Sequence, residues 1–163
     1  MSIKTGDNIP DGTFTIMTED GPAPLTTNDL FGGKKVVLFS VPGAFTPTCS
    51  AKHLPGFVDH AEDLLKAGID RIACMSVNDV FVMNAWGKSA QANKISMLAD
   101  GNGEFTSAIG LELDASGFGM GQRSQRFALI ADDGVITELF IEGPGEFRVS
   151  SAEHVLSILN EAE

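Results

Sequence analysis

The hydrophobic pattern predicts four strands in the first two thirds of the chain. Residues 13–17 alternate between polar and apolar side chains, as a half-buried strand does. The apolar run Val36–Phe39 predicts a buried strand over 34–41, residues 69–77 predict a second buried strand, and residues 95–99 predict a short third one of this kind. Helical patterns separate these runs, so the chain alternates between strand and helix.

A helix is predicted between the two long apolar runs, from about residue 50 to residue 67. Its apolar side chains recur at helical spacing and form one stripe: Leu54, Phe57, Val58, Ala61, Leu64 and Leu65. Pro55 removes one backbone hydrogen bond inside this pattern, so we expect a kink in the first turns. Gly68 is suited to cap the C-terminal end.

The rest of the chain adds short helices and a hairpin. Helices are predicted over 27–31, after Asn78-Asp79, over 104–109, and over 151–159 with Ser151 as the N-cap. Strands are predicted over 127–131 and 135–141, joined by the turn Asp132-Asp133-Gly134.

This order of elements predicts the fold class. Early alternation of strand and helix gives parallel strands, and the late hairpin adds an antiparallel pair. With a cysteine at a strand-to-helix turn, the pattern is typical of an α/β, thioredoxin-like fold with a mixed central sheet flanked by helices. We expect a single domain over residues 1–163. Periodicity alone leaves a flavodoxin-like sheet as the alternative.

Composition and charge narrow the classes of partner. The 163 residues are 43% hydrophobic, and the formal net charge is -11. Negative charge argues against nucleic acid and against anionic membrane surfaces, since both require basic patches. No apolar run approaches the ~20 residues that span a bilayer, and the first residues lack the apolar stretch of a secretory signal. We therefore expect a cytoplasmic protein without a membrane partner.

Cys49 is the main candidate for chemistry. It follows the apolar run 34–41 and stands at or near the first turn of the predicted helix. Unpaired N–H groups and the positive end of the helix dipole favour a thiolate at such a position. A buried structural cysteine is the alternative, but the neighbouring hydroxyls of Thr46, Thr48 and Ser50 favour a functional thiol.

The sequence around Cys49 resembles the active-site signature of the peroxiredoxins, which follows the pattern Pro-x-x-x-Thr-x-x-Cys. The signature reads here Pro42-Gly43-Ala44-Phe45-Thr46-Pro47-Thr48-Cys49. This fuller spelling is similar to the type II branch, which is Prx5-like and includes plant-type and bacterial members. The similarity continues through Lys52-His53-Leu54-Pro55-Gly56-Phe57, Ser76-Val77-Asn78-Asp79, Leu98-Ala99-Asp100 and Arg123-Ser124-Gln125-Arg126-Phe127.

The resemblance implies a thiol peroxidase that reduces hydrogen peroxide and alkyl hydroperoxides. Carried over residue by residue, it makes Cys49 the peroxidatic cysteine, whose thiolate is oxidised to a sulfenic acid. Thr46 would hold the incoming oxygen, Pro42 would shield the thiolate, and Arg126 would be the cation beside it. A fixed guanidinium both favours a thiolate and stabilises charge that builds on the peroxide oxygens. No metal and no organic cofactor is implied.

The resemblance also implies partners. Members of the branch form homodimers through the residue that matches Phe45 and through neighbouring loops, which extends here to Phe45 and Phe118. The implied reductant is glutathione with glutaredoxin, or thioredoxin. Animal members use a second cysteine near the C-terminal helix, but the matching residues 145–151 contain none.

Cys74 is the other cysteine. Some plant-type members have a second cysteine at the matching place, which makes Cys74 a candidate resolving thiol that condenses with the sulfenic acid on Cys49. A buried core cysteine within the strand 69–77 is the alternative. We expect regeneration by glutathione and glutaredoxin rather than through a Cys49–Cys74 disulfide.

His53 and Arg123 lie within the same matched segments, and Cys49 would also suit functions other than peroxide reduction. We interpret His53 as a histidine at the edge of the apolar stripe, with an activating Cys–His pair as the alternative. Arg123 is interpreted as a surface ion-pair partner. Cys49 would also suit a peroxide sensor or a redox-regulated holdase. A cysteine hydrolase needs a distant histidine and acid, for which the sequence offers no convincing pair.

Overall fold

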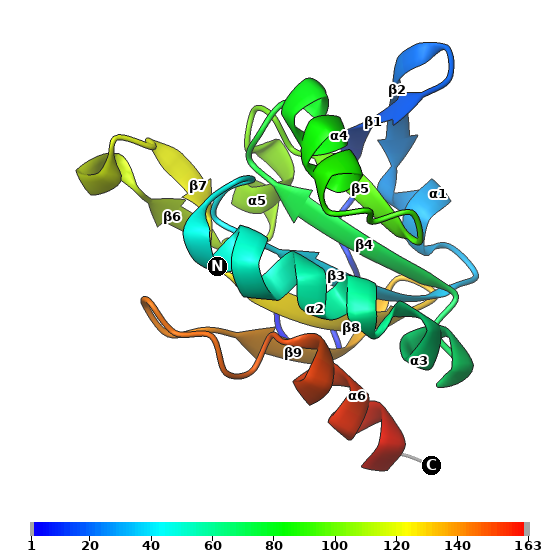
Figure 1. Ribbon diagram of the computed structural model, residues 1–163. Coiled ribbons are helices and arrows are strands. Elements are labelled where there is room, and N and C mark those ends of the chain that lie inside the picture. The colour runs from blue at the N-terminus through cyan, green and yellow to red at the C-terminus, as the bar shows by residue number, and fades with distance from the viewer. Residues whose placement is uncertain (1, 162–163) are drawn as a thin grey trace.

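Seven strands form one mixed sheet in the order β2-β1-β5-β4-β3-β8-β9 (Figure 1). The computed structural model describes residues 2–161. The strands of this sheet are β1 (Thr13–Thr18), β2 (Gly21–Thr26), β3 (Lys35–Ser40), β4 (Arg71–Ser76), β5 (Ile95–Ala99), β8 (Phe127–Asp132) and β9 (Val135–Ile141). β3, β4 and β5 are parallel neighbours, whereas β8 pairs antiparallel with β3 in the middle of the sheet. That pairing separates this fold from an all-parallel flavodoxin-like sheet.

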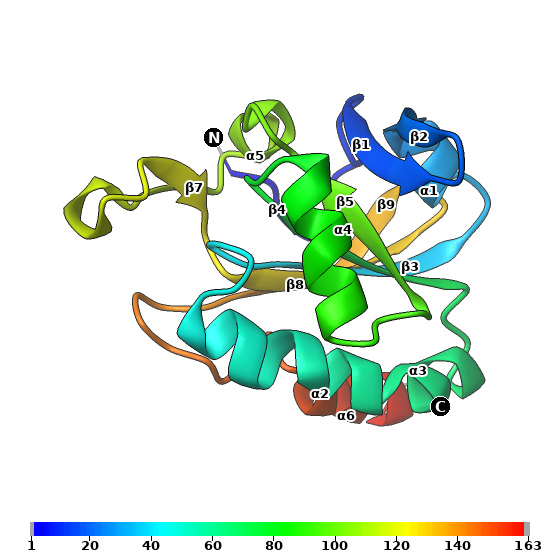
Figure 2. The same cartoon turned by 45° about the horizontal axis from the view of Figure 1, so that its top comes forward.

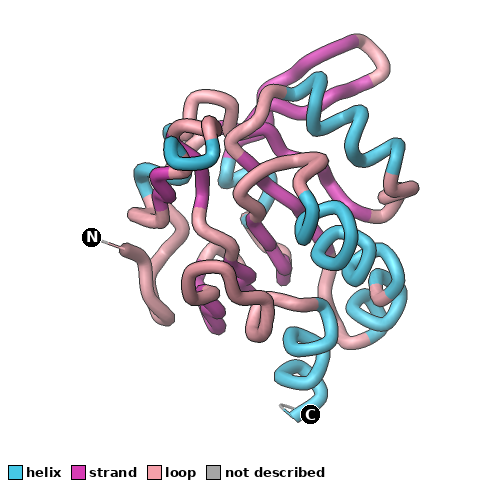
Figure 3. Tube along the Cα trace, turned by 60° about the vertical axis from the view of Figure 1, so that its left-hand side comes forward, coloured by secondary structure: helices cyan, strands magenta, loops and turns pink. Residues whose placement is uncertain are grey.

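Helices cover both faces of the sheet. They are α1 (Thr27–Phe31), α2 (Leu54–Asp59), α3 (Ala61–Lys66), α4 (Val80–Ser89), α5 (Glu104–Ala108) and α6 (Ala152–Glu161). In Figure 2, α2, α3 and α6 lie together below the sheet, and α1 and α5 lie above it. The N-terminus and the end of α6 lie on different sides of the molecule (Figure 3). Within residues 2–161, no helix has both the length and the apolar character that crossing a bilayer requires.

Alternate side chains of the central strands build two separate cores. Val37 and Phe39 of β3 belong to a buried cluster with Trp86 of α4 and with side chains of α2, α3 and α6. Val36 and Leu38 belong to a second cluster, beneath α1 and α5. Both faces of β3 and β4 are therefore covered, which explains why these strands are continuous apolar runs in the sequence.

The segment after Cys49 is helical, but the predicted single helix over 50–67 is wrong in detail. A π-helical turn, Cys49–His53, comes first, and the Leu54 N–H donates to the Cys49 carbonyl. Pro55 has no N–H to donate, which accounts for a widened turn where the kink was expected. A second distortion, at His60 (φ −102°, ψ 8°), divides α2 from α3 without any signal in the pattern. Gly68, with φ +103°, follows the end of α3 as predicted.

Two hairpins of the structure have no counterpart in the hydrophobic pattern. β2 contains Pro22 and Pro24, which indicate a turn; the strand tolerates both because it is an edge strand that pairs with β1 alone. β6 (Glu112–Asp114) and β7 (Gln122–Ser124) form a separate ribbon around a 3-10 turn, Ser116–Phe118. Three-residue strands are too short to show a period. The ribbon projects from one end of the sheet (Figure 1).

Candidate active site

Cys49 lies beyond the carboxyl end of β3, in the first turn of the helical segment that follows. β3 ends at Ser40, and a helical hydrogen bond runs from the Ser50 N–H to the Thr46 carbonyl (2.9 Å). Amides at a helix start have no intrahelical acceptor, and the helix dipole favours an anion there. The Cys49 side chain is fully buried, and its thiol is free. The fold thus places the Cys49 thiol where negative charge is stabilised.

The turn before Cys49 is fixed by residues that follow β4 and by close packing. The Ala44 N–H donates to Asn78 Oδ1 (2.9 Å), and the Ser76 hydroxyl donates to the same oxygen (2.6 Å). A Cβ atom on Gly43 would lie 3.0 Å from Met120 Cε and 3.1 Å from Thr46 Cγ2, so this approach favours glycine. Asn78, which the sequence offers only as a helix start, therefore supports the active-site turn.

Thr46 and Pro42 lie in the turn between β3 and Cys49. The Thr46 hydroxyl donates to the Gly43 carbonyl (2.7 Å), so its hydrogen is committed and its oxygen remains an acceptor for another O–H. Pro42, Thr48 and Arg126 line a pocket of about 360 Å³. Arg126 lines this pocket, whereas the Cys49 side chain is fully buried behind it and does not line it.

Arg126 precedes β8 and directs its guanidinium at the cysteine. Its Nη2 donates to Cys49 Sγ at 3.0 Å, and its Nη1 donates to His53 Nδ1 at 2.8 Å. The guanidinium carbon also lies 5.8 Å from the centre of the Phe147 ring. The planar guanidinium bonds through both terminal nitrogens and therefore keeps one orientation, so its positive charge stays beside the Cys49 sulfur. The structure thereby brings together two residues that are 77 positions apart in the chain.

His53 takes a role that the sequence interpretation does not give it. It is fully buried rather than at the edge of the apolar stripe, and its Nε2–H donates to the Ser150 carbonyl (2.9 Å). Because a guanidinium can only donate, Nδ1 must accept from Arg126, which fixes the neutral tautomer. Burial, reinforced by the charge of Arg126, lowers the pKa of His53 from 6.5 to about 3. His53 therefore supports the arginine as a neutral acceptor, and the alternative of a Cys–His pair is replaced by a Cys–Arg–His chain.

The free energy of unfolding should depend on pH through His53. Its folded-state pKa of about 3 lies below its unfolded value of 6.5, so the unfolded chain binds the additional proton between these values. The stability that neutral His53 contributes is complete above the unfolded pKa and falls by roughly 1.4 kcal/mol for each pH unit below it. Denaturant unfolding of the wild type and of His53→Gln, at about pH 7 and about pH 5, measures the difference. An equal pH dependence in both proteins would contradict it.

Cys74 lies in β4, fully buried and in the same cluster as Cys49. Burial raises the pKa of the Cys74 thiol well above its ordinary value, and the nearby Cys49 raises it further. A protonated and enclosed thiol is a poor nucleophile. The structure favours the core interpretation of Cys74, because attack on a sulfenic acid at Cys49 would require local movement.

Arg123 is not a surface ion-pair partner, and that interpretation is wrong. Its Nε donates to the Met120 carbonyl (2.9 Å) and its Nη1 to the Val77 carbonyl (3.2 Å). Arg123 therefore connects the β6–β7 ribbon to the end of β4. Arg126, not Arg123, donates to the Cys49 sulfur. In the part of the chain from residue 2 to 161, no three His, Cys, Asp or Glu side chains converge as a metal site would require.

Comparison with known proteins agrees with this geometry. The sequence matches the Redoxin family over residues 4–156. Peroxiredoxin-2B from Arabidopsis thaliana is 52% identical over 159 residues, which cover 96% of this chain and 98% of that protein. The similarity therefore extends well beyond the signature around Cys49.

Solved structures show the same relationship. Reduced Prx3 from Vibrio vulnificus, solved in complex with H2O2, superposes with a TM-score of 0.94 at 52% identity, over 96% of this chain and 99% of that chain. Peroxiredoxin 5 from Alvinella pompejana gives a TM-score of 0.85 at 38% identity, over 98% and 99% of the two chains. The predicted thioredoxin-like fold is confirmed, and the chain belongs to the peroxiredoxins, a family of thiol peroxidases, in their type II, Prx5-like branch.

Proposed function

We propose that Cys49 is the peroxidatic cysteine and that it reduces hydrogen peroxide and alkyl hydroperoxides. The observation that carries this proposal is the 3.0 Å contact from Arg126 Nη2 to the buried Cys49 Sγ. A guanidinium in that position favours the thiolate and remains available to the oxygens that the sulfur attacks. The V. vulnificus relative that was solved with H2O2 supports the choice of substrate.

The proposed reaction is a two-electron transfer from sulfur to the peroxide. The Cys49 thiolate attacks one oxygen, a sulfur–oxygen bond forms, and the oxygen–oxygen bond breaks. Sulfur becomes a sulfenic acid, while the leaving oxygen takes up a proton and departs as water or an alcohol. Thr46 accepts a hydrogen bond from the peroxide, Arg126 stabilises the developing negative charge, and Pro42 screens the sulfur from water.

Glutathione with glutaredoxin is the proposed reductant, and thioredoxin is the alternative. A glutathione thiolate attacks the sulfenic sulfur, the oxygen leaves as water, and the mixed disulfide that remains is exchanged onto glutaredoxin. Two observations support an external thiol: Cys74 is enclosed with a raised thiol pKa, and residues 145–151 contain no cysteine.

Cys74→Ser should leave turnover with glutathione and glutaredoxin within about twofold of the wild type, because a core residue takes no part in the exchange. The same change should lower the free energy of unfolding by about 1–3 kcal/mol, since it places a hydroxyl in an apolar cluster. Coupled turnover and denaturant unfolding measure the two effects. A large loss of turnover in a folded variant would instead make Cys74 the resolving thiol.

The mass of the intact protein after one equivalent of hydrogen peroxide, with free thiols then blocked, tests the whole proposal. A gain of one oxygen at Cys49 is expected. A loss of two hydrogens, with no free thiol left, would show a Cys49–Cys74 disulfide and favour a dithiol reductant. An unchanged mass would refute the peroxidase assignment for Cys49.

A peroxide sensor or redox-regulated holdase would use the same cysteine. Rapid, repeated turnover with an added reductant separates a peroxidase from both.

We also propose a homodimer, which is supported by the exposure of Phe45 (54%) and Phe118 (86%). The mass of the native protein in solution tests this association. A cytoplasmic location stays a prediction from the sequence.

A further inference from the structure

Residues 142–151, between the end of β9 and the start of α6, form one wall of the site beside Arg126. The Ser150 carbonyl accepts the Nε2–H of His53 (2.9 Å), and the Phe147 ring lies 5.0 Å from the His53 ring and 5.8 Å from the guanidinium carbon. The wall thus touches both the arginine and the histidine that holds it. Its conformation must therefore influence where the guanidinium lies.

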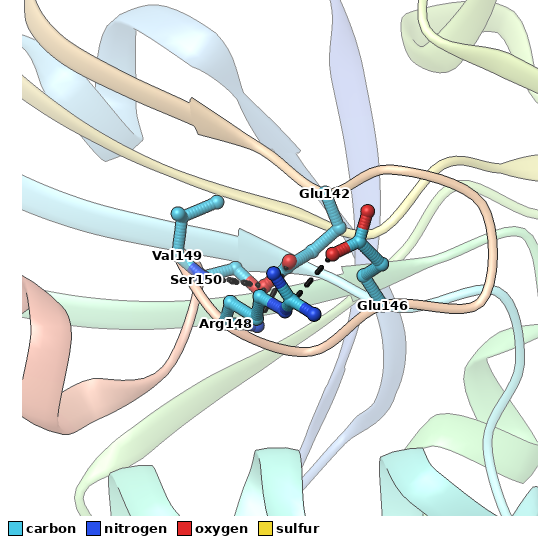
Figure 4. Close-up of polar contacts among 5 residues, drawn as sticks. All are labelled: Glu142, Glu146, Arg148, Val149 and Ser150. Atoms are coloured by element: carbon cyan, nitrogen blue, oxygen red, sulfur yellow. Dashed lines mark hydrogen bonds and ion pairs between the residues drawn. The ribbon is translucent and has the colours of Figure 1, made fainter.

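Glu142 is the first residue of this wall, and its side chain fixes the rest of the wall through hydrogen bonds. It follows the end of β9, and its own N–H donates to the Arg126 carbonyl (3.0 Å), which anchors it beside the arginine's backbone. The side chain is buried, with an exposed fraction of 8%. Its carboxylate accepts the N–H groups of Arg148, Val149 and Ser150 at 2.8–2.9 Å and the Ser150 hydroxyl at 2.6 Å (Figure 4).

The carboxylate of Glu142 is suited to this position by its charge and its acceptors. Burial raises the pKa of Glu142, but the hydrogen bonds from residues 148–150 outweigh it, so the pKa lies below the ordinary value and the group stays ionised. Three convergent N–H groups and a hydroxyl need acceptors only, and a carboxylate is an acceptor at both oxygens. By contrast, the ion pair between Glu146 and Arg148 (3.0 Å) lies at the surface and contributes little to the wall.

We propose that Glu142 is a positioning residue for the peroxidase reaction: it fixes residues 148–150 so that Ser150 and Phe147 hold His53, and His53 holds the Arg126 guanidinium on the Cys49 sulfur. The hydrogen bond to the Cys49 sulfur comes from Arg126; Glu142 lines the pocket beside that arginine without bonding to the sulfur. It acts through the chain of contacts that runs from Ser150 to His53 and on to Arg126. The proposal rests on the function proposed for Cys49.

Glu142→Gln tests the proposal with a side chain of the same shape. The amide keeps one acceptor oxygen but directs an NH₂ group at backbone N–H groups, so the wall should shift. We expect oxidation of Cys49 by hydrogen peroxide, measured in a single turnover, to slow by about 10- to 100-fold. Glu153→Gln is the matched control: Glu153, in α6, contacts His60 at the surface and lies outside this network.

The same substitution in an Arg126→Ala background separates positioning from a general structural effect. If Glu142 acts through Arg126, Glu142→Gln should slow the Arg126→Ala enzyme less than about twofold. Slowing by the same factor in both backgrounds would overturn the proposal, as would a single variant as fast as Glu153→Gln. Circular dichroism checks folding; if Glu142→Gln does not fold, Ser150→Ala removes one donor to Glu142, and the same non-additivity is expected on a smaller rate effect. A wild-type protein that fails to oxidise at Cys49 would refute the proposed function instead.

Discussion

Cys49→Ser is expected to abolish peroxide reduction, with a loss of at least about 10⁴-fold, because a serine hydroxyl is neither ionised at neutral pH nor readily oxidised. The fold should survive, since serine differs by one atom in a site that already contains a guanidinium donor 3.0 Å from the sulfur. Peroxide consumption with glutathione and glutaredoxin measures the loss. Cys74→Ser is the matched control, because it makes the same chemical change in the same buried cluster. Turnover that survives in Cys49→Ser would refute the assignment of the nucleophile.

Arg126→Ala is expected to slow the oxidation of Cys49 by about 10²- to 10³-fold, the loss typical of removing one preorganised donor to a developing charge. The substitution removes the contact to Cys49 Sγ and leaves His53 Nδ1 without its donor. Single-turnover oxidation of the wild type and of Arg126→Ala by hydrogen peroxide measures the loss.

Two further variants test how Arg126 acts. Arg126→Lys keeps the charge, but an ammonium cannot hold the sulfur and the imidazole with the fixed fork of a guanidinium. We therefore expect a rate between those of the wild type and Arg126→Ala. Arg71→Ala, at the opposite end of β4, removes an arginine far from the cysteine and should leave the rate unchanged. An oxidation rate that is equal in the wild type and in Arg126→Ala would contradict the role given to Arg126.

The fold followed from the sequence where burial produces a clear period. The central strands β3 and β4 have both faces covered, so each appears as a continuous apolar run. The hydrophobic pattern predicts no strand where hydrogen-bonded pairing alone forms one. This is the case in β2, which contains two prolines, and in the three-residue strands β6 and β7. It also gives no sign of the distortion at His60. Tertiary contacts decide these features, because the local sequence does not favour them over a turn or a regular helix.

The residues of the candidate site divide in the same way. A cysteine at a strand-to-helix turn, with Pro42 and Thr46 before it, is a local arrangement, and a short stiff segment determines it within the sequence itself. The cation is different, because Arg126 is 77 positions from Cys49 and was indicated only by resemblance to a family. Only the fold brings its guanidinium to the sulfur and leaves Arg123 bonded to backbone carbonyls.

The sequence by itself determined the candidate nucleophile, the class of fold and the family, because each depends on local spacing or on periodic burial. The tertiary structure alone decided what surrounds that nucleophile. His53 meets the Ser150 carbonyl across 97 positions, and Glu142 gathers the amides that shape this wall. Such contacts leave no periodic signal, because they depend on how β9, α6 and the segment after Cys49 pack together. Once packed, burial removes competing water, so a neutral histidine and an ionised glutamate can hold one arginine in place.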